Sequence, residues 1–427
     1  MRTGVLICVL SLGAATMSSA QTAASGSAGK TGGSTSAATA ESRPASNEGW
    51  LPEPHILSAG VDFASQWLGG DDTVPRDGLY PDFDIVTGAG WISAGPGYRR
   101  HVWNGHALVD ASAAMSWRAY KEARARFELP ALAHDHLTVG AQARWQDYTQ
   151  VNYFGRGPDA LHEQRSEYRL QDTDVLGYGI VRPHAGLSVS GRFGWLKQPT
   201  LSSPTGPFDR DYPNALVQFA GEPGVADPTS YLHGDVAVTA DSRNYPGHPT
   251  RGGFYRAAAG FYSDRNLDRY SFRRYEAEGL QMLPVATEKW LVALHGWGVF
   301  SDTAAGNDVP FYLLPSLGGD RTLRGYDNFR FHDRNLLLAS VESRWALFRQ
   351  VDAALFAEAG NVAARAGDLN FDKTSYGAGV RVHTRTATIG RLDVGHSQEG
   401  WQVYVALNDP LRLTRRTERN TVVPIVP

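Results

Sequence analysis

Hydrophobic and polar residues alternate with a period of two in several separate stretches of the chain. The alternation is clean from Ala107 to Trp117 and from Leu137 to Trp145. It returns near the end of the chain, from Tyr376 to His383 and from Trp401 to Asn408. A period of two places successive side chains on opposite faces of an extended strand. The pattern therefore predicts an all-β protein whose strands separate two different surroundings.

Alternating strands occur in soluble β-sandwiches and in membrane barrels, so the surroundings of the two faces decide between these folds. Three features favour a barrel in lipid: long strands, apolar faces that end on Trp or Tyr, and polar faces with Arg, Asp and Glu suited to a wet lumen. At about twenty residues for each strand and its connection, residues 88–407 hold about sixteen strands. We therefore expect a transmembrane antiparallel β-barrel of about sixteen strands.

The segments outside the predicted barrel differ from it in composition. Residues 1–20 read as a signal peptide, with a basic start, an apolar stretch and small residues before the expected cut. Residues 21–48 are almost entirely Ala, Ser, Thr and Gly, so we expect a disordered linker. We assign residues 49–87 to a short N-terminal segment, which could be a helix or a docking segment. Residues 88–408 then form the barrel and residues 409–427 a C-terminal tail.

Composition excludes several classes of protein. The single cysteine, Cys8, lies within the predicted signal peptide, so the mature chain is expected to have no disulfide and no cysteine metal site. After the signal peptide there is no run of about eighteen apolar residues, which excludes helical membrane spanning. The formal net charge is -3 and no long basic block is present, so we expect no nucleic-acid partner. These observations favour the bacterial outer membrane, reached after cleavage of the signal peptide.

A glycine-rich motif is the most specific local sequence in the chain. It contains Gly318, Gly319, Arg324, Gly325 and Tyr326. An arginine at a glycine-flanked loop tip suits a lumen, because the guanidinium can bind a carboxylate in a forked geometry while glycine lets the backbone approach the wall. The motif resembles the BamA/TamA superfamily of outer-membrane barrels, also called the bacterial surface antigen family. The resemblance implies that this loop folds back into the lumen.

The resemblance also implies a partner for Arg324. In the family, the partner is an acid on a strand after the loop, in a Phe-x-Asp-x-Gly pattern. The corresponding sequence here runs from Phe356 to Gly360 and has Glu358 in place of Asp. Glu342, on the preceding strand, is the competing partner. We therefore expect Arg324 to pair with Glu358 or Glu342 inside the barrel.

Two further stretches carry the same resemblance. One is a strand-turn-strand motif that ends in Pro-Thr-Arg-Gly and contains Asp241, Arg243, Pro249, Arg251 and Gly252. The other is the Tyr-Phe-Gly-Arg-Gly-Pro sequence from Tyr153 to Pro158. The resemblance covers roughly residues 88–407, and its motifs are more specific for the fold than for an activity.

Two features depart from the family pattern. Members that insert or secrete proteins carry periplasmic POTRA modules before the barrel, and the stretch from Gln21 to Asp84 fits no such module. The family usually stops on an aromatic strand residue, whereas this chain continues to Pro427. The last strand, which the barrel assembly machinery is expected to recognise, contains Trp401, Val403, Tyr404, Val405 and Leu407.

No stretch of the sequence predicts catalysis. Ser316 and His332 lie near glycines, but a Gly-x-Ser-x-Gly elbow is absent and the resemblance gives this segment another role. His134 and His136 could share one side of a strand, but no third ligand stands at a suitable spacing for zinc. We therefore expect no enzymatic activity, no metal site and no cofactor.

The resemblance implies a function in assembly or translocation, in which proteins or lipids pass a weak seam between the first and last strands. One alternative is a solute pore in which the loop acts as a plug. Another is a structural surface antigen without insertase activity. The expected partners are outer-membrane lipid, client proteins or lipids, and the barrel assembly machinery that would insert the chain itself.

Overall fold

The structure is a computed structural model. It describes residues 49–51, 61, 77–83, 88–207, 212–285, 287–411 and 413. The predicted signal peptide and linker lie outside the described residues, as do most of the predicted N-terminal segment and most of the tail. Among the described residues, no helix has both the length and the apolar character needed to cross a membrane.

One antiparallel sheet of seventeen strands forms the wall, and a second sheet of two strands, β13 and β14, is separate from it. The strands are β1 (Gly78–Asp82), β2 (Ser93–Val102), β3 (Ala107–Ser116), β4 (Lys121–Leu132), β5 (Leu137–Tyr153), β6 (Ser166–His184), β7 (Leu187–Leu196), β8 (Thr200–Ser202), β9 (Tyr231–Asp241), β10 (Gly252–Asp264), β11 (Phe272–Val285), β12 (Thr287–Thr303), β13 (Ser316–Leu317), β14 (Phe331–His332), β15 (Asn335–Phe348), β16 (Val351–Ala363), β17 (Lys373–His383), β18 (Thr388–Ser397) and β19 (Gly400–Ala406). The helical elements are η1 (Gly88–Gly90), η2 (Trp103–Gly105), η3 (His162–Gln164), α2 (Ala215–Gln218), η4 (Phe311–Leu313) and η5 (Ala366–Asp368).

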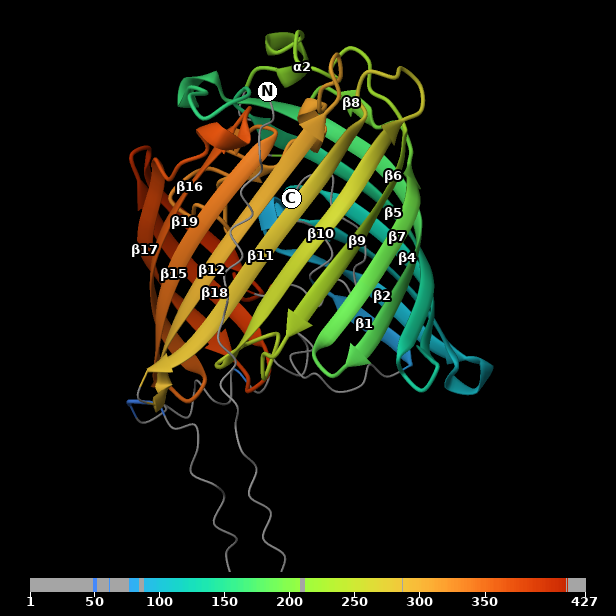
Figure 1. The fold of residues 1–427 in the computed structure, drawn as a ribbon. Helices are drawn as coiled ribbons and strands as arrows, with labels where there is room; N and C mark the ends of the chain where they lie inside the picture. The colour runs from blue at the N-terminus through green and yellow to red at the C-terminus, as the bar shows by residue number, and fades with distance from the viewer. Residues whose placement is uncertain are drawn as a thin grey trace, which may run out of the picture. The chain divides into compact units, whose positions relative to one another are not determined.

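The wall strands pair in chain order from β1 to β19, and the tilted strands curve around a common axis (Figure 1). β8 pairs with β6 at residues 169–171, beyond the point where β7 ends its own ladder with β6. Because β8 continues the line of β7, the seventeen strands of the sheet fill sixteen positions. The predicted barrel of about sixteen antiparallel strands is therefore confirmed.

The apolar side chains of the alternating strands point out of the barrel. On β3, Met115 is 56% exposed, whereas Ser112 and Ser116 are buried. On β5, Val139 is exposed and Arg144 is buried. The outer face is thus suited to lipid and the inner face is polar, which is the arrangement that the alternation predicts.

The two ends of the barrel differ in their connections. At one end, strands meet in short turns such as residues 185–186 and 349–350; at the other, longer loops such as 154–165 and 304–334 join them. We call these the short-turn end and the long-loop end. In bacterial barrels the short turns face the periplasm. Exposed aromatic side chains mark both ends. They are Trp103, Tyr255 and Trp290 at the short-turn end, and Trp117, Trp195, Tyr376 and Trp401 at the long-loop end.

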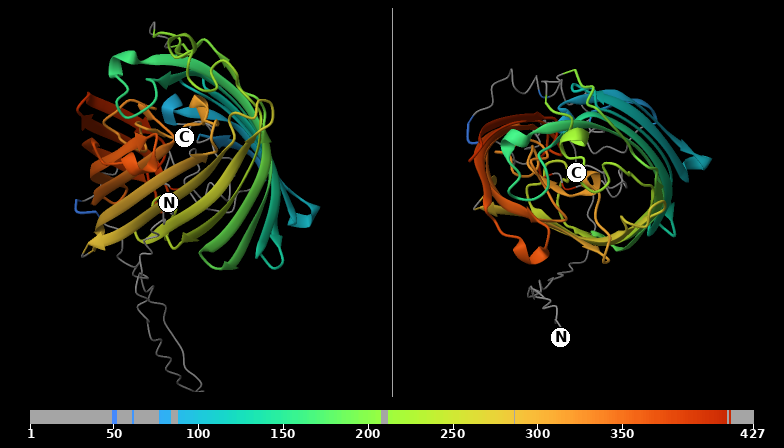
Figure 2. Two further views of the ribbon diagram at one scale, coloured as in Figure 1. Left: turned by 45° about the horizontal axis from the view of Figure 1, so that its top comes forward. Right: turned by 90° about the horizontal axis from the view of Figure 1, so that it is seen from above.

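Chain segments lie inside the ring of strands, as the view along the axis shows (Figure 2). The connection 304–334 carries the β13–β14 hairpin, and its apolar side chains, including Leu317 and Leu323, pack against inward-facing residues of β12, β15 and β16. The start of the tail enters the lumen too, because Leu411 and Leu413 pack in a cluster with Phe254 of β10. The short-turn end is therefore partly closed by the chain itself.

Two predicted boundaries differ from the structure. The wall begins at Gly78 on β1, ten residues before the predicted start at 88, within the segment that we assigned to the N-terminal region. β1 has five residues with Gly78 at a φ of 123° and Pro81 near its end, so its alternation is too short to detect. At the other boundary, β19 ends at Ala406, so Leu407 lies just beyond the last strand.

Candidate functional site in the barrel lumen

The Arg324 side chain is buried in the lumen, with 1% of its surface exposed. Its Nε donates to Glu358 Oε1 at 2.7 Å and its Nη1 donates to Glu342 Oε2 at 2.8 Å. The backbone N–H of Arg324 donates to the second oxygen of Glu358 at 2.6 Å. The guanidinium also lies over the ring of Phe356, 3.5 Å from its centre. The structure thus brings Arg324 together with both of the acids named from the sequence.

The two acids lie on neighbouring strands and share the inner face. Glu358 of β16 stands opposite Ser340 of β15, and Glu342 follows Ser340 by two residues. Positions two apart share a face of a strand, so both carboxylates point into the lumen. The forked guanidinium can therefore bind one carboxylate with each side, which a lysine in its place could not do.

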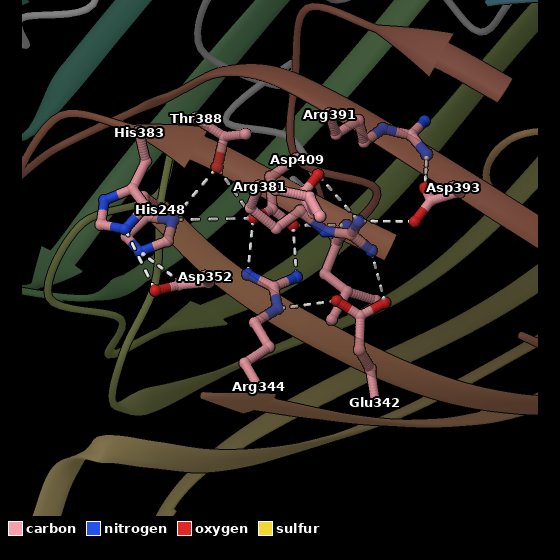
Figure 3. A network of polar contacts seen from close by, with 12 residues as sticks. His248, Glu342, Arg344, Asp352, Arg381, His383, Thr388, Arg391, Asp393 and Asp409 are labelled. Atoms are coloured by element: carbon pink, nitrogen blue, oxygen red, sulfur yellow. Dashed lines mark hydrogen bonds and ion pairs between the residues drawn. The ribbon is translucent and has the colours of Figure 1, made fainter. Parts of the chain in front are cut away.

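Glu342 also belongs to a larger network of charged side chains (Figure 3). Arg381 Nη2 donates to Glu342 at 3.1 Å, and its Nη1 donates to Asp393 at 2.5 Å. Arg344 donates to both oxygens of Asp409, at 2.6 and 2.8 Å. Arg391 joins Asp393 to Asp320 of the loop. Each buried arginine in this network has acidic partners, which buried charges require.

The charge balance keeps Arg324 ionised. Burial alone would lower the pKa of Arg324, but the surrounding carboxylates of Glu358, Glu342 and Asp393 raise it above its usual value. Asp409 shows the complementary effect. Burial would raise its pKa, but the charge and hydrogen bonds of Arg344 hold the pKa well below its usual range.

The glycines of the motif allow the loop to lie against the wall. A Cβ on Gly325 would stand 2.6 Å from the backbone carbonyl of His396 on β18. Gly318 and Gly319 have φ values of 105° and 114°, a conformation that favours glycine. A Cβ on Gly360 of β16 would meet the carbonyl oxygen of Leu337 at 2.5 Å. These positions require glycine because of close approach or backbone conformation.

The loop also contacts the last two strands. Ser397 Oγ of β18 donates to the carbonyl of Gly325 at 2.6 Å, and Tyr404 Oη of β19 donates to the carbonyl of Tyr326 at 2.5 Å. Tyr404 is therefore an inward residue. The other strand residues that we proposed for recognition, Trp401, Val403 and Val405, are exposed on the outer face.

The Pro-Thr-Arg-Gly motif lies in the connection between β9 and β10 at the short-turn end. Arg243 donates to both oxygens of Asp241, at 2.9 and 2.8 Å, and lies over the ring of Phe254. Gly252 has a φ of 89° where β10 begins. Arg251 is exposed, and its Nη1 lies 4.0 Å from a carboxylate oxygen of Glu288. This motif shapes a turn, and only Arg243 of its two arginines is buried.

The Gly-Arg-Gly stretch of the third motif binds the loop 304–334 at the long-loop end. Arg156 donates to both oxygens of Asp308, at 2.9 and 3.0 Å, and to Asp333 at 3.1 Å. Burial alone would raise the pKa of Asp308, but hydrogen bonds and charge from Arg156 lower it. The loop is thus anchored by Arg156 at its ends and by Arg324 near its middle.

Sequence reasoning missed several members of the network. Arg381 and Arg391 stand at inward positions of their strands, so the alternation could have identified them as lumen residues. Their partners could not be identified, because these depend on the register between strands. Asp409 could not be identified as a lumen residue from the sequence, because it follows the last strand and lies among the residues that we assigned to the tail.

Comparisons with known proteins agree with the barrel fold. A family model described as the Omp85 superfamily domain matches residues 109–395. Among solved structures, the chain is similar to BamA from Haemophilus ducreyi lacking POTRA domains 1-3, with 15% identity and a TM-score of 0.57 over 77% of this chain and 69% of that one. A search of curated protein sequences gives no match.

Two further structures are CdiB proteins. CdiB from Escherichia coli has 14% identity and a TM-score of 0.50, over 79% of this chain and 64% of that one. CdiB from Acinetobacter baumannii has 12% identity and a TM-score of 0.46, over 74% and 56%. The chain thus spans less than two thirds of either CdiB protein. At these identities the likeness concerns the fold alone.

Proposed function

The chain belongs to the Omp85 superfamily, and from this premise we propose that it moves or inserts proteins or lipids at the outer membrane through the seam between β1 and β19. The seam carries the proposal because its two edges are the shortest strands of the wall, and the ladders of the described residues pair β1 with β2 and β19 with β18 but not β1 with β19. β1 has five residues and β19 has seven, whereas the other wall strands have between ten and nineteen, apart from the β8 extension. A short edge strand leaves backbone groups with which a client strand can pair.

The lumen loop supports one side of this seam. Gln402 of β19 donates to Asp327 at 3.3 Å, beside the bond from Tyr404 to Tyr326. The loop therefore braces the last strand from inside. Because this brace holds β19, the seam opens by movement of β1, and the edge of β19 is the template for an incoming strand.

The solute-pore alternative has weaker support. The loop 304–334 and the start of the tail both occupy the lumen, and buried ion pairs hold them at Arg324 and Asp409. A route along the seam leaves these contacts intact, whereas a route through the lumen would have to break them. In the function that we propose, the wall and the loop act on a client protein or lipid without catalysing a chemical reaction.

A tether across the seam tests the proposal. Leu79 on β1 and Val403 on β19 both face outward, at 83% and 61% exposure. The variant Leu79→Cys with Val403→Cys is joined by a flexible bis-maleimide linker and placed in lipid vesicles. We measure how fast a urea-denatured client barrel folds into these vesicles, using the gel shift of folded barrels. The linked protein should lose its ability to accelerate client folding.

A second tether provides the control. Val109 on β3 and Phe127 on β4 are paired in a regular ladder and are both exposed. Linking cysteines at these positions leaves the seam free, so it should not change the rate. Equal acceleration by the seam-linked barrel would contradict the proposal. Salt conductance across planar bilayers without any effect on client folding would favour the solute pore instead.

A further inference from the structure

The β9–β10 connection, residues 242–251, crosses the short-turn end of the lumen and contacts strands that are not its neighbours in the wall. In the order of the wall, β11, β12 and β15 separate it from β16. Gly247 nevertheless lies beside Ala387 in the turn between β17 and β18, and the backbone N–H of Thr388 donates to the carbonyl of Gly247 at 3.0 Å. A Cβ on Gly247 would stand 2.7 Å from the carbonyl oxygen of Thr386, so the two backbones are in close contact. We call residues 242–251 the strap.

The strap is a compact arm whose base is closed by its own hydrogen bonds. The Asn244 side chain donates to the hydroxyl of Thr250 at 2.7 Å. Its oxygen accepts from the backbone N–H groups of Thr250 and Arg251, at 3.1 and 3.3 Å. Near the tip of the arm, Pro246 and His248 are buried. Because the base does not depend on the far strands, the contacts at the tip decide whether the arm lies across the lumen.

His248 makes most of the contacts at the tip (Figure 3). Its ring stacks on that of His383 of β17, with centres 3.8 Å apart and planes 9° from parallel. Its Nε2 lies 3.4 Å from an oxygen of Asp352 of β16. Its Nδ1 lies 3.1 Å from the hydroxyl of Thr388. That hydroxyl donates to Asp409 of the tail at 3.1 Å, so it accepts from His248.

The charges around His248 are balanced while its ring is neutral. His383 Nδ1 lies 2.8 Å from a backbone carbonyl oxygen, and its Nε2 lies 3.2 Å from Asp352. Both nitrogens face acceptors, so this ring carries both hydrogens and forms an ion pair with Asp352. Arg344 of β15 binds both oxygens of Asp409. Each of the two carboxylates that face His248 therefore already has a cation, and a proton on His248 would add a buried charge without a counter-charge of its own.

Such a charge weakens the closed arrangement. Two stacked cations with ring centres 3.8 Å apart repel each other. Burial and the charge of His383 lower the pKa of His248 to about 3. An exposed histidine has a pKa of about 6.5. Because the released strap therefore binds a proton more readily than the closed one, closure is strongest above about pH 6.5 and weakens as the pH falls from there towards about pH 3.

We propose that the strap is an acid-released latch, which holds the short-turn end of the lumen closed until His248 is protonated. Release also frees the Thr388 hydroxyl, which bonds both His248 and Asp409, so the strap and the start of the tail loosen together. In bacterial barrels this end faces the periplasm. The latch acts on the mouth of the lumen and does not depend on a route along the seam.

Labelling of a thiol in the strap tests the proposal. Pro246 is buried, and Pro246→Cys is the only thiol of the mature chain if the signal peptide is cleaved as expected. The full mature barrel reacts with an aromatic disulfide reagent, which modifies thiols at acidic pH. The rate, relative to that of a free thiol at each pH, follows the fraction of released strap. It should rise about 10²-fold between pH 8 and pH 4.5. A constant relative rate, in a barrel that the gel shift shows to be folded, would overturn the proposal.

Substitution of His248 separates the latch from other titrating groups. In the Pro246→Cys barrel, His248→Gln keeps an N–H donor for Thr388 but cannot gain a proton, so its relative rate should stay constant between pH 8 and pH 4.5. His134→Gln, at an exposed histidine of the same end, should leave the rise unchanged. An equal rise with and without His248→Gln would contradict the role of His248. If His248→Gln does not fold, His248→Asn replaces it, and a flat rate in the Pro246→Cys barrel alone still overturns the proposal.

Discussion

Replacing Arg324 with alanine should release the lumen loop while the wall stays folded. Arg324 is 1% exposed and binds Glu358 at 2.7 Å and Glu342 at 2.8 Å. Alanine removes the cation and leaves two buried carboxylates without their shared partner. The wall does not depend on this contact, because its ladders run between the strands themselves. The cost therefore falls mainly on the attachment of the loop.

The size of the effect follows from the cost of breaking a buried ion pair. Removing one partner of such a pair costs about 3–5 kcal/mol. Since about 1.4 kcal/mol corresponds to a factor of ten, the population of the released loop should rise about 10²- to 4 × 10³-fold. Arg324→Lys keeps the charge but not the fork that reaches both acids, so its effect should be intermediate.

A cysteine in the loop can report this release. Ser316 of β13 is 4% exposed, and cysteine is close to serine in size. If the signal peptide is cleaved as expected, Ser316→Cys is the only thiol of the mature chain, because Cys8 is the only native cysteine. The rate at which a maleimide polymer labels this thiol follows the fraction of loop that is released. The gel shift on heating shows in parallel that the barrel remains folded.

The outcome that would refute this reasoning is specific. Arg269→Ala serves as a matched control, because the Arg269 side chain is exposed and lies 3.5 Å from Asp227 in an exposed ion pair. Labelling in Arg324→Ala that is no faster than in the control, in a folded barrel, would mean that Arg324 does not hold the loop.

Three further predictions concern the loop anchor, the lipid face and the tail. Arg156 lowers the pKa of Asp308, so their bond should persist from pH 8 down to about pH 4 and weaken only as the pH falls further, toward the lowered pKa of Asp308; labelling of the loop thiol as a function of pH, relative to that of a free thiol at each pH, measures this. A shift of this weakening to neutral pH would contradict the assignment. On the outer face of β5, Ala143→Arg should destabilise the barrel by about 2–4 kcal/mol in urea titrations in lipid, whereas Leu132→Arg, near a turn, should cost about 0–1 kcal/mol. Equal costs would mean that the strand lies at another depth. Finally, Asp409→Asn should cost about 3–5 kcal/mol in the same titrations, because it leaves a buried arginine with a weaker partner. No change would show that the tail is not held there.

The wall of the barrel could be predicted from the sequence because each strand meets two solvents. Lipid outside and water inside impose a period of two on every long strand, as at Met115 beside Ser116 or Val139 beside Gly140. This signal is local, so it survives without knowledge of strand pairing. It fails for β1, whose five residues include Gly78 and Pro81.

The candidate site could be predicted only in part, because its contacts are long-range. Arg324 could be identified from its glycine-rich motif, and Glu342 and Glu358 could be identified as its candidate partners from their positions on the strands that follow the loop. The sequence could not decide between the two acids, and the structure shows that the fork binds both. The pairing of Asp409 with Arg344 depends on which strands and loops meet across the lumen. No local pattern records that information.

The way in which the loop is held argues for a route along the seam. Its polar side is fixed by Arg324, while its apolar side chains Leu317, Leu323 and Phe331 pack against the inner wall. Moving the loop out of the lumen would leave buried charges unpaired and also expose this apolar surface to water, and both costs act together. Opening the seam incurs neither cost, since only the short strands β1 and β19 border it. A client strand could pair with the edge of β19, whose described ladder lies on the β18 side, so the barrel can open sideways while its lumen stays filled.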